Sequence, residues 1–113
     1  MIESFAFGAM VVNGRKYASD LIIFPNGRVQ ERWWRRRGHV LTQDDIQSLL
    51  DAGPDMIIAG TGMSGRMTPE SGLSHVINNM GIQFFSVPNE KAVKMYNLHT
   101  QKARVGACFH LTC

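Results

Sequence analysis

The residues with the most distinctive chemistry form a glycine-rich turn, Gly60 to Arg66, which directly follows a short apolar stretch. In open α/β sheets, ligands bind beyond the carboxyl ends of strands, where a loop leads into a helix. Glycines let backbone amides turn toward an anion, and hydroxyl and guanidinium groups add further donors. The sequence therefore predicts a small-anion or small-molecule site made by Gly60, Thr61, Gly62, Ser64, Gly65 and Arg66, with Asn97 and His39 as residues that reach it from elsewhere.

This turn matches no specific phosphate motif. A P-loop requires a lysine before Ser or Thr, and a dinucleotide-binding fingerprint requires three glycines of fixed spacing at the start of a helix. Two interpretations therefore stay open, a ligand site with or without catalysis and a tight strand-to-helix connection in which the glycines serve only the backbone. The sequence predicts no catalytic residue and no cofactor.

A second candidate is the basic and aromatic segment Arg32-Trp33-Trp34-Arg35-Arg36-Arg37. Basic side chains contact phosphates and aromatic rings stack on bases, as in nucleic-acid-binding proteins. In a strand, however, Trp33 and Trp34 point to opposite faces and cannot form one stacking platform. We therefore expect one tryptophan to be buried. The remaining residues form either a solvated basic strand or a surface for a protein partner or an anion, with nucleic acid disfavoured.

The two cysteines, Cys108 and Cys113, lie five residues apart in a predicted strand, which separates their Cα atoms by about 16 Å. A disulfide needs about 6 Å, so free thiols in a reducing compartment are expected. Two cysteines without a second pair or a histidine cluster also give no zinc signature, so no metal is predicted. Cys108, His110 and Thr112 share one strand face, but adjacent side chains on a face are too far apart for a thiol–imidazole pair.

Asp20 precedes the apolar run Leu21-Ile22-Ile23-Phe24, which places a carboxylate near the edge of the core. Such a group needs a partner, and His39 or one of the arginines would supply it. The pair is interpreted either as structural or as part of a polar pocket. Asn97 carries the same two alternatives, while its neighbour Tyr96 is expected to pack in the core.

Composition limits the class of protein. The chain has 113 residues, 44% hydrophobic and 19% charged, which predicts one folded domain over residues 1–113. No apolar run approaches the roughly 18 residues of a membrane span, and no targeting segment is recognisable, so we expect a cytoplasmic protein. The net charge of +3 is local, because five of the 12 basic residues lie between Arg28 and Arg37.

The elements that position these residues begin with an antiparallel meander. Phe5–Val12 is predicted as the first strand, and Asn13-Gly14 as a tight hairpin turn, because both of its central positions need positive φ. Lys16–Phe24 is the predicted second strand. After a turn at Pro25-Asn26-Gly27, the third strand is expected over Arg28–Arg36.

Helices and strands then alternate. Thr42 and Asp45 form a predicted capping box for a helix, and Met56–Ala59 has the continuous apolar pattern of a strand that is buried on both faces. After the glycine turn, Thr68-Pro69-Glu70 is expected to start a second helix that Gly81 terminates.

The remaining elements complete the predicted fold. Ile82–Val87 is the next strand, and Asn89 is expected to cap a third helix with an apolar face. Val105–Thr112 closes the chain as a strand. The apolar face of the third helix is expected at Ala92, Val93, Tyr96 and either Leu98 or His99. The order βββ-α-β-α-β-α-β predicts a three-layer α/β domain with a mixed, mostly parallel central sheet.

Several short motifs, taken in order, resemble one family: a small α/β domain of archaea, bacteria and mitochondria whose function is unknown. The motifs span the whole chain and are Asn13-Gly14, Tyr17-Ala18-Ser19-Asp20, Trp33-Trp34, Gly38-His39, Ile58-Ala59-Gly60-Thr61-Gly62 with Gly65, Ala92, Tyr96-Asn97 and His110-Leu111-Thr112-Cys113.

The family's animal members include a mitochondrial assembly factor for respiratory complex I and a cytosolic protein associated with fat-cell differentiation. The resemblance implies a three-layer fold and a noncatalytic role in binding a protein partner or in assembly, and it supplies no catalytic residues. The family usually has Thr before the third helix, where this chain has Asn89; both residues can cap. On this basis Trp33, Trp34, Arg35 and Arg36 are the predicted partner surface.

Overall fold

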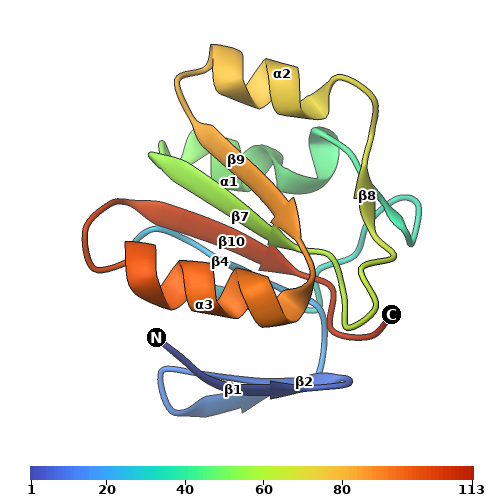
Figure 1. Cartoon of the computed structure of the whole chain (residues 1–113), viewed down its shortest axis with the longest axis vertical. Coiled ribbons are helices and arrows are strands. Elements are labelled where there is room, and N and C mark those ends of the chain that lie inside the picture. The colour runs from blue at the N-terminus through green and yellow to red at the C-terminus, as the bar shows by residue number, and fades with distance from the viewer.

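The central layer of the protein is a five-stranded mixed sheet, shown in Figure 1 by a computed structural model that describes residues 1–113. Its strand order is β5-β4-β10-β7-β9. Strands β7, β9 and β10 are parallel, whereas β4 runs antiparallel to both of its neighbours, so four of the five strands point the same way. The strands are β4 (Leu21–Ile23), β5 (Val29–Glu31), β7 (Met56–Gly60), β9 (Gln83–Val87) and β10 (Val105–Phe109). The predicted fold class is confirmed.

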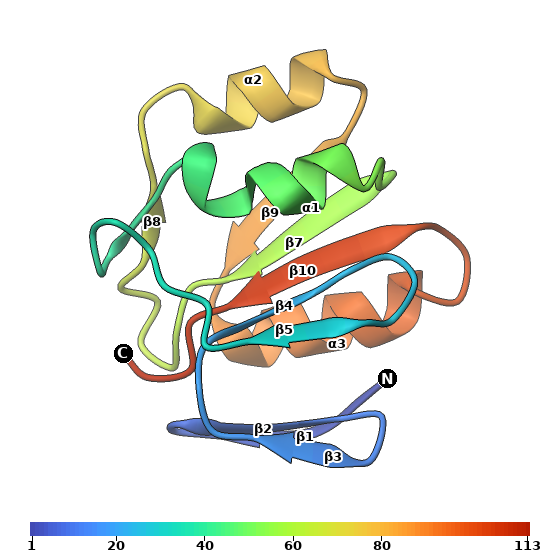
Figure 2. The same ribbon diagram turned by 180° about the vertical axis from the view of Figure 1, so that it is seen from behind.

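Both faces of this sheet are covered, which explains why β7 and β10 are apolar throughout. Successive residues of β7 alternate between two cores: Ile57 and Ala59 pack on one face and Met56 and Ile58 on the other. The first face carries a 3₁₀ turn (Asp44–Ile46), α1 (Gln47–Asp51) and α2 (Leu73–Asn79). Figure 2 shows α1 and α2 above this face.

The second face carries α3 (Asn89–His99) and a separate three-stranded sheet. That sheet is an antiparallel meander of β1 (Ile2–Ala6), β2 (Ala9–Val12) and β3 (Arg15–Tyr17). The predicted single strand over Phe5–Val12 is wrong, because the chain reverses at Gly8, whose φ of 77° suits a tight turn. The Asn13-Gly14 hairpin is confirmed, with φ values of 50° and 82°.

The predicted second and third strands are too long. Lys16–Phe24 is divided by Ala18 to Asp20, so β3 belongs to the meander and β4 to the central sheet. Arg28–Arg36 pairs with β4 only over Val29–Glu31, and Arg32 then turns the chain with a left-handed φ of 54°. Residues 32–39 therefore form a loop, which we call the tryptophan loop.

The capping box before α1 is confirmed. The Thr42 amide donates to Asp45 Oδ2 at 2.9 Å, and the Asp45 amide donates to Thr42 Oγ1 at 3.4 Å. The helix start predicted at Thr68-Pro69-Glu70 is wrong. Thr68–Pro69 is the short strand β8, which pairs with β6 (Val40–Leu41) because its backbone groups find partners there, and α2 begins only after Gly72. Gly81 ends this helix as predicted, with φ at 80°.

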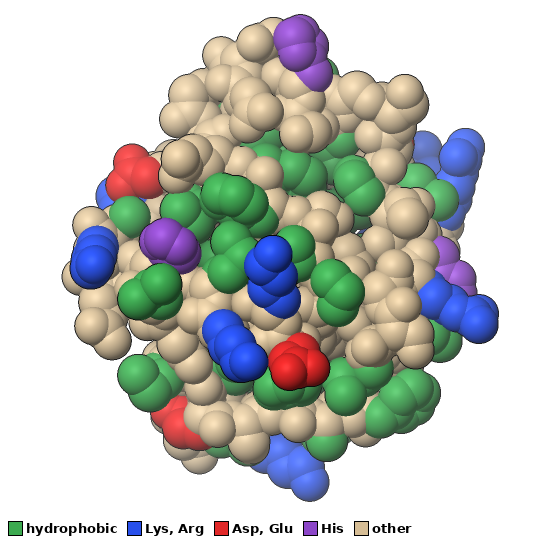
Figure 3. Space-filling view, in the orientation of Figure 1, with side chains coloured by type: hydrophobic (Ala, Val, Ile, Leu, Met, Phe, Trp, Pro, Cys, Tyr) green, Lys and Arg blue, Asp and Glu red, His purple; other side chains and the backbone are tan.

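The last elements follow the prediction with two corrections. Strand β10 ends at Phe109 and not at Thr112, because the chain then leaves the sheet to bond with the glycine turn. On α3, Tyr96 is buried as expected, and its burial raises the pKa of its hydroxyl. Leu98 is 59% exposed, so it is not part of the apolar face. On the side of the molecule shown in Figure 3, hydrophobic side chains are interspersed with Lys and Arg. None of the helices has the length and apolarity that crossing a bilayer requires.

Candidate functional site

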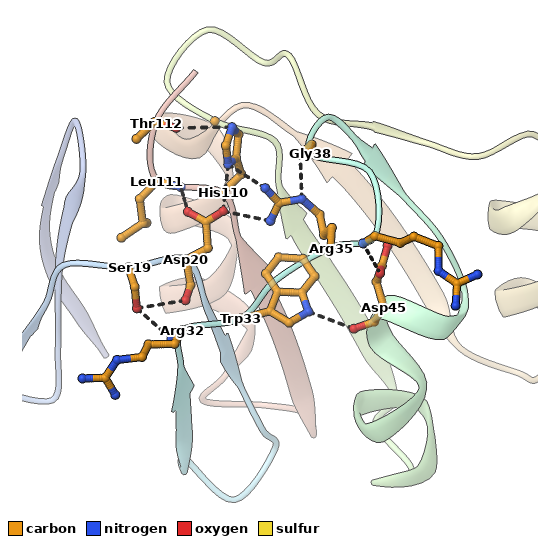
Figure 4. A network of polar contacts seen from close by, with 12 residues as sticks. Ser19, Asp20, Arg32, Trp33, Arg35, Gly38, Asp45, His110, Leu111 and Thr112 are labelled. Carbon is orange, nitrogen blue, oxygen red and sulfur yellow. Dashed lines mark hydrogen bonds and ion pairs between the residues drawn. The ribbon is translucent and has the colours of Figure 1, made fainter.

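A buried polar network lies at the carboxyl end of β10. Asp20 immediately precedes β4, whose antiparallel register with β10 brings it beside His110. One carboxylate oxygen of Asp20, Oδ2, lies 2.9 Å from His110 Nδ1 and 2.8 Å from Arg35 Nη1, while the other accepts the Leu111 amide at 2.7 Å (Figure 4). The predicted pairing of Asp20 with an arginine is confirmed. Its second partner is His110 and not His39.

The members of this network depend on one another. The side chains of Arg35 and Asp20 are only 5% and 12% exposed, so each charge lacks water to stabilise it. Arg35 Nη1 is close to Asp20 but not aligned as a hydrogen-bond donor, so this contact is an ion pair. The same guanidinium donates from Nε to the Gly38 carbonyl at 2.8 Å and lies 4.8 Å from the centre of the Trp33 ring.

Two groups of opposite chemistry meet at one nitrogen of His110. The Asp20 carboxylate can only accept a hydrogen bond and the Arg35 guanidinium can only donate one, and their Oδ2 and Nη2 atoms lie 2.9 and 3.0 Å from Nδ1. In the tautomer in which Nδ1 donates to Asp20, the lone pair is on Nε2, which is 3.4 Å from the Thr112 hydroxyl. In this tautomer His110 presents an electron pair on the side away from Asp20.

The two tryptophans of the tryptophan loop differ sharply in burial. Trp33 is 3% exposed, and its ring nitrogen donates to the Asp45 carbonyl at 2.8 Å, as Figure 4 shows. Trp34 is 75% exposed. The expected burial of one tryptophan is confirmed, but the reason differs, because the residues lie in a loop and not in a strand. Of the other predicted partner-surface residues, Arg36 is exposed and Arg35 is held in the network.

Trp34 also borders a cavity of about 370 Å³. The cavity opens against the polar network, so an exposed ring and a buried ion pair share one hollow. The residues that line it include Ser19, Asp20, Trp34, Arg35, His110 and Thr112. Such a mixture of one large apolar group with converging polar groups is typical of binding sites.

In the glycine turn, most backbone amides donate hydrogen bonds to other parts of the chain and are not free for an anion. The Gly62 amide donates to the Asn89 side chain at 3.1 Å, and the Met63 amide donates to the Thr112 carbonyl at 2.7 Å. The Ser64 and Arg66 amides both donate to the Cys113 carbonyl, at 3.3 and 3.1 Å. The amides that would cradle an anion therefore bind residues 112–113 of the chain itself and Asn89.

Close packing explains the glycines of this turn. A Cβ on Gly60 would overlap the Phe109 ring, and one on Gly62 would overlap the backbone of Cys113. Thr61 is buried, while Ser64 and Arg66 are exposed and retain free side chains. Anion binding at Gly60–Arg66 stays a prediction, and these side chains are the donors that remain for it.

Asn89 is the important residue that the sequence did not identify. Its predicted role as a helix cap is wrong, since no side-chain bond caps α3. The side chain is 1% exposed, accepts the Gly62 amide and donates to the His110 carbonyl at 2.8 Å. It thus ties the glycine turn to the segment after β10. The partners lie 27 and 21 positions away, so no local pattern indicates this role.

The other predicted residues lie in distinct places. Asn97 forms two hydrogen bonds of 2.8 Å with the backbone of Ile2, which join α3 to the meander. Cys108 and Cys113 are free thiols, as predicted. Burial raises the pKa of Cys108 to about 12, so its thiol stays protonated and does not serve as a nucleophile. His39 is exposed, and its ring centre lies 5.5 Å from that of His110.

The three-layer fold, with the polar network at the carboxyl end of β10, defines a class of small α/β domains. Within that class, residues 2–110 match the model of the protein family of unknown function DUF498/DUF598, and the chain belongs to this family. The resemblance inferred from the motifs is thereby confirmed.

Solved structures share the same fold. A conserved hypothetical protein of Pyrococcus horikoshii OT3 has 23% identity and a TM-score of 0.86, with 100% of this chain and 99% of that chain covered. A protein named MT938 has 27% identity and a TM-score of 0.79 over 100% and 98% of the two chains. A Bordetella pertussis protein described as a Mth938-like domain has 16% identity and a TM-score of 0.65 over 98% and 85%.

Proposed function

We propose that the protein is a noncatalytic binding or assembly factor that docks a protein partner on Trp34 and the arginines around it. The observation that carries the proposal is the 75% exposure of Trp34 beside a tryptophan that is 3% exposed. Trp and Arg are enriched among the residues that dominate binding energy at protein interfaces, and Trp34 lies among exposed arginines.

The loop supports Trp34 on both sides. Before it, Trp33 is anchored by its ring nitrogen and by a backbone bond to the Asp20 carbonyl at 3.0 Å. After it, Arg35 is fixed by Asp20 and by the Gly38 carbonyl. A preorganised loop loses little conformational entropy on binding, which favours affinity.

The charge of the loop indicates the chemistry of the partner. Arg32, Arg36 and Arg37 are exposed, and none of them takes part in an ion pair of the chain. Charge complementarity favours a partner whose surface has an apolar pocket for Trp34 bordered by carboxylates. An assembly role, as in the complex I assembly factor that the sequence resembles, is the form of this function that we propose. A cytoplasmic location belongs to the same proposal, because both cysteines are unpaired.

The test begins with affinity purification of wild-type protein and the Trp34→Ala variant, followed by measurement of Kd for each purified candidate partner. Loss of a hot-spot tryptophan is expected to weaken the specific complex about 30-fold or more. The matched control is Phe7→Ala, since Phe7 is also an exposed aromatic residue, at 67%, but lies in the β1–β2 turn.

Charge reversal tests the second part of the proposal. Arg36→Glu and Arg37→Glu should slow association and reduce its dependence on salt, because these charges attract the partner before contact. If Trp34→Ala and Phe7→Ala bind every partner as tightly as the wild type does, the tryptophan loop is not the docking surface.

A further inference from the structure

Three potential metal ligands converge beside the polar network: His39 from the tryptophan loop, His110 after β10, and Cys113. Their ligand atoms all lie within 4.8 Å of one another. The sequence did not predict this cluster, because His39 is distant along the chain from His110 and Cys113, which lie close together at its end. We propose that these three residues bind Zn²⁺ and leave a fourth coordination position for solvent or a ligand. The inference does not depend on the partner surface.

His110 is prepared for this role by Asp20. Histidines that bind metals usually donate their second ring nitrogen to a carboxylate, which fixes the tautomer and orients the ring. Here Nδ1 lies 2.9 Å from Asp20 Oδ2, and in the tautomer in which Nδ1 donates to that oxygen, Nε2 carries the lone pair. His110 is 6% exposed, and this makes its orientation rigid. Asp20 is therefore a positioning residue for the proposed site.

The backbones of the other two ligands are also held. The Cys113 carbonyl accepts the amides of Ser64 and Arg66, and the His39 carbonyl accepts the Thr68 amide at 2.9 Å. The glycine turn thus supports the segment that carries two of the three ligands. This support gives the turn a role that does not require it to bind an anion.

Only small side-chain movements would bring the three ligand atoms into the geometry of tetrahedral zinc coordination. Zinc bonds of about 2.0 Å to nitrogen and 2.3 Å to sulfur place tetrahedral ligand atoms roughly 3.5 Å apart. No separation exceeds 4.8 Å, so each must shorten by at most about 1.3 Å, which rotation of the exposed His39 and partly exposed Cys113 side chains can supply.

The donor set selects the class of ion. Two imidazoles and one thiolate suit Zn²⁺, which has no geometric preference of its own and tolerates an open position. Arg35 lies on the Nδ1 side of His110 and its charge is balanced by Asp20, so it does not face the proposed ion. Because His39 is exposed and Cys113 is half-buried, a water or ligand can reach the fourth position from solvent.

The test is titration of the untagged, chelator-stripped chain with Zn²⁺ in competition with a chromophoric chelator, under reducing conditions. We expect one ion per chain with a Kd of about 1 µM or tighter. Co²⁺ should give a thiolate-to-metal charge-transfer band and the intense visible bands of tetrahedral coordination. Cys113→Ser should remove the charge-transfer band. Both Cys113→Ser and His39→Ala should weaken Zn²⁺ binding more than the roughly 10–100-fold loss expected for Asp20→Asn.

Controls separate the site from adventitious binding. Cys108→Ala and His75→Ala remove a thiol and an imidazole that lie outside the cluster, and both should leave the Kd unchanged. Binding weaker than about 100 µM, or binding that survives both Cys113→Ser and His39→Ala, overturns the site. Selective binding of copper without Zn²⁺ would overturn the choice of ion.

Discussion

The glycine turn and the tryptophan loop lie at the same edge of the central sheet, yet they use their polar groups in opposite ways. The amides of Gly62, Met63, Ser64 and Arg66 all bond within the chain. In the tryptophan loop, a buried network instead supports an exposed ring and a cavity. A conspicuous motif can therefore serve the backbone alone, while an exposed segment is held in place by residues that are distant in sequence.

The difference has a physical cause. Close packing at Gly60 and Gly62 leaves no room for a side chain, and this closeness lets residues 112–113 occupy the amides of the turn. The tryptophan loop buries one large ring as an anchor and thereby leaves the next one in solvent. The glycine turn therefore serves the packing of the backbone, whereas the tryptophan loop leaves an aromatic ring exposed to solvent.

The largest loss of stability is expected for Gly62→Val. Gly62 has φ at 111°, and a Cβ would overlap the Cys113 backbone, which cannot move aside like a flexible side chain. We expect a loss of about 5 kcal/mol or more in the free energy of unfolding, or no folded protein. Urea denaturation measures it. Gly72→Ala is the control, because Gly72 has φ at 84° but open space around it, and should cost about 1 kcal/mol. Equal effects would show that packing at the turn is unimportant.

The two tryptophans of the tryptophan loop should differ in their effect on stability. Trp33→Ala should lower the free energy of unfolding by about 4 kcal/mol, because it removes a buried ring and its bond to Asp45. Trp34→Ala should change it by about 0.5 kcal/mol or less. Denaturation of both variants is the measurement. A large loss of stability for Trp34→Ala would mean that this ring is part of the fold and not a free surface.

The ion pair in the network should have the next largest effect. Asp20→Ala leaves the buried Arg35 without its partner and should cost about 3 kcal/mol. Adding Arg35→Met should recover part of this loss, because an apolar side chain needs no partner there. A double-mutant cycle by denaturation tests the coupling. Strictly additive losses would contradict the mutual dependence of the two charges.

The smallest expected effect is a pH dependence of the free energy of unfolding that comes from the buried thiol of Cys108. Burial raises the pKa of Cys108 from 9.0 to about 12, so the folded state retains a proton that the unfolded state releases. The stability from this group is complete below pH 9 and is lost as the pH rises toward 12, by about 1.4 kcal/mol per unit. Denaturation between pH 7 and pH 10.5 should show that Cys108→Ala lacks this decline. The same slope in both proteins would exclude Cys108 as its source.

Sequence patterns predicted the layers well because apolar strands and paired turn residues act locally. The apolar run at β7 and the turn at Asn13-Gly14 are examples. The bounds of the first three predicted strands were harder, since single residues such as Gly8 and Arg32 redirect the chain. The network could be predicted only in part: Asp20 needed a partner, but its contacts with Arg35 and His110 depend on strand order. Asn89 and the cluster of His39, His110 and Cys113 depend on tertiary contacts alone.

The tryptophan loop, and not the glycine turn, is the surface that we propose for a protein partner. The most direct test leaves Trp34 in place and replaces the exposed Arg36, and in a second protein the 40% exposed Met63 of the glycine turn, with a photo-crosslinking amino acid before cells are irradiated. We expect one specific adduct from position 36, which Trp34→Ala diminishes, and none from position 63. An adduct from position 63 alone would contradict the proposed docking surface.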